Sequence, residues 1–104
     1  MKTKIQNNSI NMEAQPRPKF PLGRVLITSQ AYEQLPLGDQ LAALGRHQYG
    51  DWGEICEEDR EENELSLREG YRLLSVYHSH TGKAFYIITE HDRSATTILL
   101  PCEY

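Results

Sequence analysis

The chain has 104 residues, of which 38% are hydrophobic and 25% are charged, with a formal net charge of −4. This length fits one domain. No stretch approaches the ~18 consecutive apolar residues of a membrane-spanning helix, and the N-terminus has no apolar core of a secretory signal. Cys56 and Cys102 are far apart, which favours two free thiols over a disulfide framework. We therefore expect a cytoplasmic protein.

The acidic charge is concentrated in one segment. Eight of the fifteen acidic residues lie between Asp51 and Glu64, with Arg60 as the single base there, so the rest of the chain is mildly basic. This distribution gives no overall attraction to nucleic acid, and direct nucleic-acid binding is not expected. A protein partner is the more natural expectation, and the sequence leaves the oligomeric state open.

Residues 1–21 are polar, contain three prolines and have no hydrophobic period. Such a segment has little to bury, which indicates a flexible N-terminal arm. Residues 22–104 are expected to form a single α+β domain.

The first half of this domain predicts one strand and two helices. A short apolar run at 24–28 indicates a strand, and 30–35 a short helix that ends at a proline. Leucines at helical spacing predict a second helix over about 38–49, with Leu41 and Leu44 facing the sheet.

The second half predicts one more helix and a sheet. A third helix is expected over about 54–69, although its apolar stripe is thin and its acidic residues repel one another. Three runs rich in aromatic and β-branched residues within 70–101 predict a three-stranded antiparallel meander, with Ile88 buried in its central strand. The order is β-α-α-α-β-β-β. We expect an antiparallel sheet of three to four strands with helices packed on one face.

Several short motifs mark the second half: GDWG at 50–53, NE at 63–64, GYRLLS at 70–75, IITEHDRS at 87–94 and TTILLP at 96–101. With these motifs, residues 22–104 resemble a family of small, uncharacterised bacterial proteins encoded on plasmids and integrative elements. The resemblance implies a cytoplasmic protein of the accessory genome and no established activity. The element order is also similar to that of RelE/ParE-type toxins, but the acidic third helix departs from those basic ribonucleases.

Common catalytic and metal-binding patterns are weak in this sequence. His78 and His80 can share a strand face, but a third metal ligand is not apparent nearby, so we expect no metal and no cofactor. Ser75 and Ser94 lack an activating motif, and Cys56 lies among carboxylates that blunt a thiol. We assign no catalytic residue.

The best candidate site is a polar cluster at one end of the predicted sheet. Pairing Ser79 with Gly82 in the hairpin places Arg72 opposite Thr89 and therefore next to Glu90. The end of the third helix, the start of a strand and the link 90–94 then meet. The cluster is either a structural ion-pair network or a binding or catalytic site. Its members are Asp51, Trp52, Asp59, Asn63, Glu64, Arg72, Glu90, Asp92 and Arg93.

Two classes of function follow from this pattern. The favoured hypothesis is a non-enzymatic protein-binding or regulatory module carried by mobile DNA, with nucleic-acid mimicry by the acidic helix as a variant. The alternative is a toxin-like ribonuclease, in which Arg72, Arg93 and either Tyr86 or His78 stabilise a phosphoryl transition state.

Overall fold

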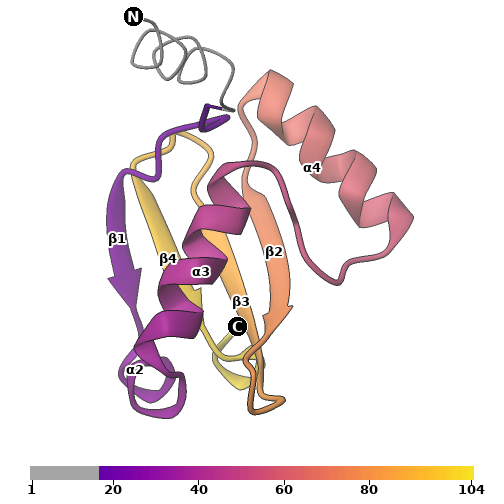
Figure 1. Ribbon diagram of the computed structural model, residues 1–104. Coiled ribbons are helices and arrows are strands. Elements are labelled where there is room, and N and C mark those ends of the chain that lie inside the picture. Colours follow the sequence, from indigo (N-terminus) through magenta and orange to yellow (C-terminus); the bar gives the residue numbers. More distant parts are fainter. Residues whose placement is uncertain (1–16) are drawn as a thin grey trace, which may run out of the picture.

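The computed structural model describes residues 17–104, which form one layer of helices and one sheet (Figure 1). The elements, in chain order, are β1 (Arg24–Ile27), α2 (Ser29–Gln34), α3 (Leu37–Gln48), α4 (Glu57–Glu69), β2 (Leu73–His78), β3 (Ala84–Thr89), β4 (Ala95–Leu99) and the 3₁₀ turn η1 (Pro101–Glu103). The predicted order and the α+β class are confirmed. Residues 1–16, most of the predicted arm, lie outside the described residues.

The sheet has four strands in the order β1-β4-β3-β2. The meander β2–β3–β4 is antiparallel, as predicted, but β1 runs parallel to β4, so the sheet is mixed and the expectation of a purely antiparallel sheet is wrong. Parallel neighbours need a long connection, and the three helices and two further strands between β1 and β4 provide one.

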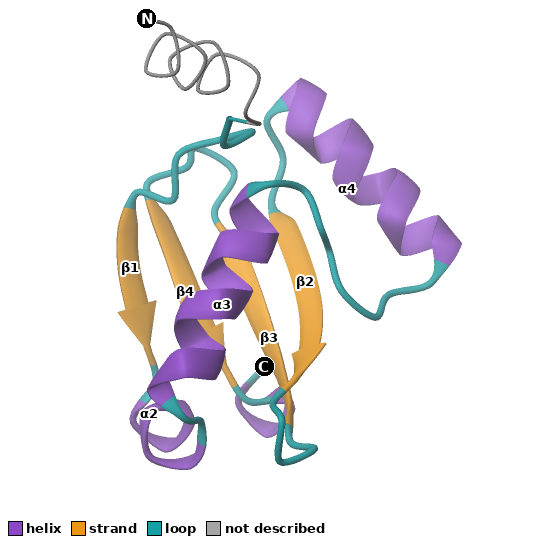
Figure 2. Cartoon of the chain, in the orientation of Figure 1, coloured by secondary structure: helices purple, strands orange, loops and turns teal. Residues whose placement is uncertain are grey.

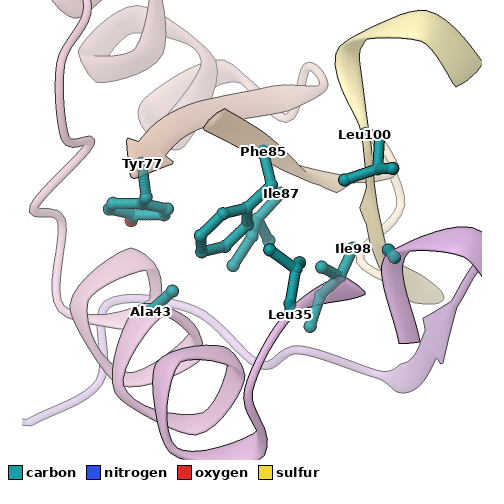
Figure 3. Close-up of a cluster of buried hydrophobic side chains, with 8 residues drawn as sticks. Leu35, Ala43, Tyr77, Phe85, Ile87, Ile98 and Leu100 are labelled. Atoms are coloured by element: carbon teal, nitrogen blue, oxygen red, sulfur yellow. The ribbon is translucent and has the colours of Figure 1, made fainter. Parts of the chain in front are cut away.

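Helices α2 and α3 cover one face of the sheet, where the main core lies. In Figure 2, α3 crosses in front of the central strands, whereas α4 stands apart beside β2. Alternate residues of the strands point toward α2 and α3, because successive side chains of a strand face opposite sides. The core they form is drawn in Figure 3 and comprises Ala31, Leu35, Ala43, Tyr77, Phe85, Ile87, Ile98 and Leu100.

Helix α3 is turned slightly from the predicted orientation. Leu41 is 60% exposed, so its predicted contact with the sheet is wrong, whereas Leu44 packs at the margin of the core. The buried positions are Gln40, Ala43 and His47. Polar residues can occupy this face because they find partners there; the Gln40 amide, for example, donates to the Leu35 carbonyl at 2.8 Å.

A second, smaller core joins α4 to the top of the sheet. It contains Phe20, Trp52 and Leu73, with Leu22, Ile55 and Leu67 packed against them. Phe20 is only 6% exposed, and the amide of Lys19 donates to the Gln48 carbonyl. The domain therefore begins before residue 22, and the predicted arm boundary at residue 21 is too late.

The segment before α4 is extended rather than helical, which shortens the predicted helix at its start. The Glu54 amide donates to the Val76 carbonyl, and the Val76 amide donates to the Trp52 carbonyl, so this segment lies along β2. Gly53 has φ +79°, and a Cβ atom there would lie 1.9 Å from the Val76 oxygen. Only glycine allows so close an approach.

The hairpin register differs from the predicted one by one residue. Leu73, not Arg72, pairs with Thr89, and His78 pairs with Ala84. The turn is longer than assumed, because the Ser79 amide donates to the Lys83 carbonyl and the loop closes there rather than at Gly82. A one-residue slip changes which side chains of the two strands lie opposite each other and share a face, so this difference changes the predicted site.

Candidate functional site

The predicted polar cluster divides into separate groups in the structure, and one group lines a hollow between α4 and β2. The hollow has a volume of about 230 Å³ and unites three predicted residues, Asp59, Asn63 and Arg72. The rest of its lining is Glu62, Ser66, Leu74 and Tyr104. Carboxylates from α4 therefore lie around one small space with Arg72, just before β2, and the C-terminal Tyr104.

Arg72 forms no ion pair in the part of the chain that the structure describes, so its predicted pairing with Glu90 or with the third helix is wrong. Its guanidinium instead donates to the Tyr104 hydroxyl and lies 5.5 Å from the centre of that ring. Arg72 lies one residue before the buried Leu73, so its side chain is on the opposite face of the sheet, beside the C-terminal tyrosine.

Asn63 anchors α4 to the sheet. It is 5% exposed, its Nδ2 donates to the Leu74 carbonyl at 2.7 Å and its Oδ1 accepts from the Leu74 amide at 3.2 Å. An asparagine side chain can satisfy both groups of one residue because it carries a donor and an acceptor side by side. Asn63 therefore occupies the outer side of β2, next to the strand-like segment at Gly53.

Trp52 and Glu64 form a second tie between α4 and the domain. The Trp52 indole is 3% exposed and donates to Glu64 Oε2 at 2.8 Å. Asp51 lies apart from them, in an exposed ion pair with Arg46 at 2.7 Å. The Arg46 guanidinium lowers the pKa of the Asp51 carboxyl group. These residues are structural contacts of the helix and its entry loop.

Arg93 holds the end of α4 against the β3–β4 turn. Its Nη1 donates to the carbonyls of Tyr71, Glu90 and His91, and its Nη2 donates to the Ser66 carbonyl in the last turns of α4. Burial lowers the pKa of Arg93. A guanidinium that is bound to several carbonyl groups serves the fold, since few of its donors remain for a ligand.

Glu90 and Asp92 belong to the same turn but not to the hollow. The Glu90 backbone closes the turn by accepting from the Arg93 amide and by donating to the Ala95 carbonyl. The Asp92 carboxylate accepts from the Ser94 amide at 3.0 Å, and hydrogen bonds from Ser94 lower the pKa of Asp92. Neither carboxylate forms an ion pair with the sheet arginines in the described chain.

The outer face of α4 is strongly acidic. Glu58, Asp59, Glu61 and Glu62 are exposed, and none of them has an ion-pair partner among residues 17–104. The one ion pair within α4 joins Arg60 to Glu57, and the pKa of Glu57 is lowered by it. The carboxylates of the helix are therefore available to solvent or to a partner.

A buried hydrogen-bonded chain lies behind the site, and the sequence analysis did not single it out. His47 is fully buried; its Nδ1 lies 2.6 Å from Ser75 Oγ and its Nε2 2.8 Å from Thr89 Oγ1. The chain continues from Thr89 to Thr96, and the Thr96 hydroxyl donates to the Leu22 carbonyl. The sequence feature that indicates this network is the position of His47 in α3, one turn after Ala43 and therefore on the same buried side of the helix.

The direction of this chain of hydrogen bonds places a proton on Nε2 of His47. Because Thr96 donates to a carbonyl, it accepts from Thr89, which accepts from His47 Nε2–H. Burial lowers the pKa of His47 to about 4, so the ring is neutral near pH 7. With its single proton on Nε2, the neutral ring accepts the Ser75 hydroxyl at Nδ1. Ser75 and His47 are both fully buried, so the pair cannot meet a substrate.

Two of the other three histidines form exposed contacts with carboxylates. His78 Nδ1 lies 3.1 Å from Glu54, and His80 Nδ1 lies 2.8 Å from Asp39. Within residues 17–104, no group of three or more histidine, cysteine or acidic residues is arranged to hold a metal ion. Both cysteines are free and exposed.

A larger hollow of about 690 Å³ lies at the opposite end of the domain, lined by residues of α2, the β2–β3 loop and the C-terminal turn. It is wide and shallow, and it contains none of the predicted site residues.

Comparisons with protein-family models, curated proteins and solved structures found no match. No helix within residues 17–104 has the length and apolar character needed to cross a membrane.

Proposed function

We propose that this protein is a non-enzymatic binding module that takes a basic partner protein along the outer face of α4. One observation carries the proposal: four exposed carboxylates on one helix have no cationic partner in the described chain. Like charges three and four residues apart destabilise a helix. A basic surface placed against α4 relieves that repulsion, so binding and helix stability support each other.

The attachment of α4 suits such a role. The helix is held by its inner side through Asn63 and by the Trp52–Glu64 hydrogen bond, which leaves the acidic side outward. Figure 1 shows α4 standing away from the layer of α2 and α3. Asp59 and Glu62 line one side of the hollow and are exposed, so a lysine or arginine side chain of a partner can pair with their carboxylates.

The ribonuclease hypothesis has less support from the geometry. The two arginines that it requires are engaged elsewhere: Arg93 binds backbone carbonyls, and Arg72 stacks on Tyr104. Arg93 does not line the hollow that contains Arg72. The resemblance to proteins of mobile elements supports a cytoplasmic accessory module and is compatible with binding to a host protein.

A capture experiment tests the proposal. The immobilised full chain is incubated with a library of basic peptides and with a bacterial lysate, at about 50 mM and about 500 mM salt. We expect basic ligands to be retained at low salt and released at high salt, because salt screens exposed charges. In the triple variant Glu58→Gln, Asp59→Asn, Glu62→Gln, retention is lost.

A matched variant controls for total charge. Glu33→Gln, Glu69→Gln, Glu90→Gln removes the same charge from other exposed positions and is expected to keep binding. Equal loss in both variants, or no salt-sensitive ligand at all, contradicts the proposal. Competition by duplex DNA for a captured ligand identifies the mimicry variant. Cleavage of bulk RNA by the wild-type chain, lost in Arg72→Ala, favours the ribonuclease instead.

A further inference from the structure

The two edge strands of the sheet, β1 and β2, differ in whether their outward backbone groups have hydrogen-bond partners. On the β2 edge, the segment at Gly53 and the side chain of Asn63 satisfy the outward backbone groups of Leu74 and Val76. On the β1 edge, no described residue pairs with the outer side of the strand. Free edges invite pairing with another strand, and proteins usually cover or charge them.

The β1 edge is apolar rather than charged. Val25 is 47% exposed and Leu26 is 40% exposed, one on each face of the sheet. Arg24 is the only charged residue of β1. The apolar exposure therefore lies on the element whose backbone is open, which is the combination that favours strand pairing.

The hydrogen bonds of β1 determine which groups are available. The Arg24 amide donates to the Ser94 carbonyl just before β4, and the Thr28 amide donates to the Ile98 carbonyl within it. Because alternate residues of a strand turn their backbone groups to opposite sides, the amides and carbonyls of Val25 and Ile27 point outward. An antiparallel copy of β1 pairs Val25 with Ile27 of the second copy, twice, and places Leu26 against Leu26 on a two-fold axis.

The charged residues near β1 favour the same register, in which Leu26 pairs with Leu26. With Leu26 on the axis, Arg24 lies opposite Thr28 of the second copy, whose hydroxyl donates to Glu103 at 2.7 Å. The guanidinium thus meets a carboxylate at each end of the interface. A register centred on Val25 sets Arg24 opposite Leu26 of the second copy instead of Thr28, and one centred on Ile27 runs into α2.

We infer that β1 is a homodimer interface, at which two copies of this chain pair antiparallel and join their sheets into one of eight strands. The occupant is a second copy because the edge is complementary to itself in backbone groups, in apolar side chains and in charge. The interface is small, and small interfaces are weak. It is separate from α4, so partner binding and dimer formation are independent.

Sedimentation velocity of the full chain over a wide concentration range tests the inference. We expect a monomer–dimer equilibrium that Val25→Pro weakens at least about tenfold, since proline removes an outward amide that makes no bond within the chain. Val25→Thr keeps that amide and is expected to retain the dimer. Circular dichroism and melting curves verify that each variant is folded.

Cross-linking tests the register directly. In a Cys56→Ser, Cys102→Ser background, Leu26→Cys places two thiols at a non-hydrogen-bonded pair, where Cα atoms are about 4.5 Å apart and a disulfide can form. Mild oxidation is expected to give a covalent dimer. Tyr32→Cys, at a 66% exposed position away from the edge, is the control. A monomer at all concentrations, a dimer insensitive to Val25→Pro, or equal cross-linking at both positions overturns the inference.

Discussion

His47 shows how one buried residue links α3 to the sheet. Its ring touches the aromatic rings of Phe20 and Trp52 edge-on, at centroid distances of 5.2 and 5.6 Å, and both ring nitrogens bind hydroxyl groups of strands. The hydrogen bonds that run from Ser75 through His47, Thr89 and Thr96 to the Leu22 carbonyl leave no side-chain polar atom without a partner. The same holds for every buried side-chain nitrogen and oxygen in residues 17–104. Such a network specifies one packing of the helix on the sheet.

The low pKa of His47 predicts a pH-dependent stability. The folded-state pKa of about 4 lies below the ordinary value of 6.5, so the unfolded chain takes up a proton first as the pH falls. Stability is fully present above pH 6.5 and is lost between pH 6.5 and 4. We expect the free energy of unfolding to fall by about 2 kcal/mol from pH 7 to pH 5, measured by urea titration.

Two variants isolate this effect. His47→Gln has no titrating group, and its stability is expected to change little between pH 7 and pH 5. His91→Gln removes an exposed histidine and is expected to keep the wild-type slope. The carboxyl groups whose pKa values are lowered contribute only at lower pH, because their ordinary values are near 4. A wild-type slope in His47→Gln contradicts the assignment.

Arg93 tests whether a fork of donors, rather than a charge, holds the β3–β4 turn to α4. Its two terminal nitrogens reach carbonyls of Ser66 and Tyr71 as well as those of its own turn. A lysine ammonium keeps the charge but cannot span these positions. We expect Arg93→Lys to lower the unfolding free energy by about 1–3 kcal/mol in denaturant titration. Arg72→Lys is the comparison, and we expect it to be near neutral because its contact is exposed.

At the scale of elements, Asn63 determines how α4 meets the sheet. Asn63→Asp keeps an oxygen for the Leu74 amide but sets a second oxygen against the Leu74 carbonyl. We expect this substitution to cost about 1–3 kcal/mol and to speed amide hydrogen exchange throughout α4. Asp59→Asn, a change at an exposed position of the same helix, should leave exchange as in the wild type. Unchanged protection in Asn63→Asp excludes this anchor.

Strand β3 offers a comparison of the two sheet faces. Ile87 is fully buried under the helices, and the neighbouring Ile88 is 6% exposed on the opposite face. The predicted burial of Ile88 is confirmed. We expect Ile87→Ala to cost about 3–5 kcal/mol and Ile88→Ala about 2–3 kcal/mol, since a cavity on the face without helices can partly collapse. A larger loss for Ile88, measured in denaturant, reverses this ranking of the faces.

The strands and helices were predictable because their signals are local, whereas the site depended on details that are not. The apolar runs of the meander and the leucine spacing of α3 indicate elements, but one extra residue in the β2–β3 turn changes every pair between these two strands. The direction of β1 depends on its neighbour in space. The His47 chain joins α3, three strands and the segment before β1, and no single stretch of sequence displays it.

At the scale of the whole molecule, the described chain separates its charge from its core. Half of the acidic residues among residues 17–104 lie in α4, and the two apolar clusters lie on the helix-covered side and at the top of the sheet. Helix α4 contributes only Asn63 and Ser66 as buried residues, so it depends on its contacts with Trp52 and β2 rather than on a broad apolar face. A helix held in this way is the natural place for a partner to act on stability.

The start of the folded domain gives the last prediction. Phe20 stacks on Trp52 at 6.2 Å, and the Arg93 guanidinium lies 5.7 Å from the centre of its ring, so residue 20 joins the second core to the β3–β4 turn. Deletion of residues 1–16, which are polar, should change the melting temperature by a few degrees at most. Deletion of residues 1–20 removes a buried aromatic ring and should lower it by at least about 10 °C.

Phe20→Ala in the full chain separates the ring from the rest of the deleted segment. If the ring is responsible, this single substitution reproduces most of the loss seen on deleting residues 1–20, about 3–5 kcal/mol in denaturant titration. Phe20→Leu keeps an apolar side chain and should recover part of it. A strong loss on deleting residues 1–16 alone would place a further stabilising contact before residue 17, whereas a weak effect of Phe20→Ala would show that the second core does not depend on this ring.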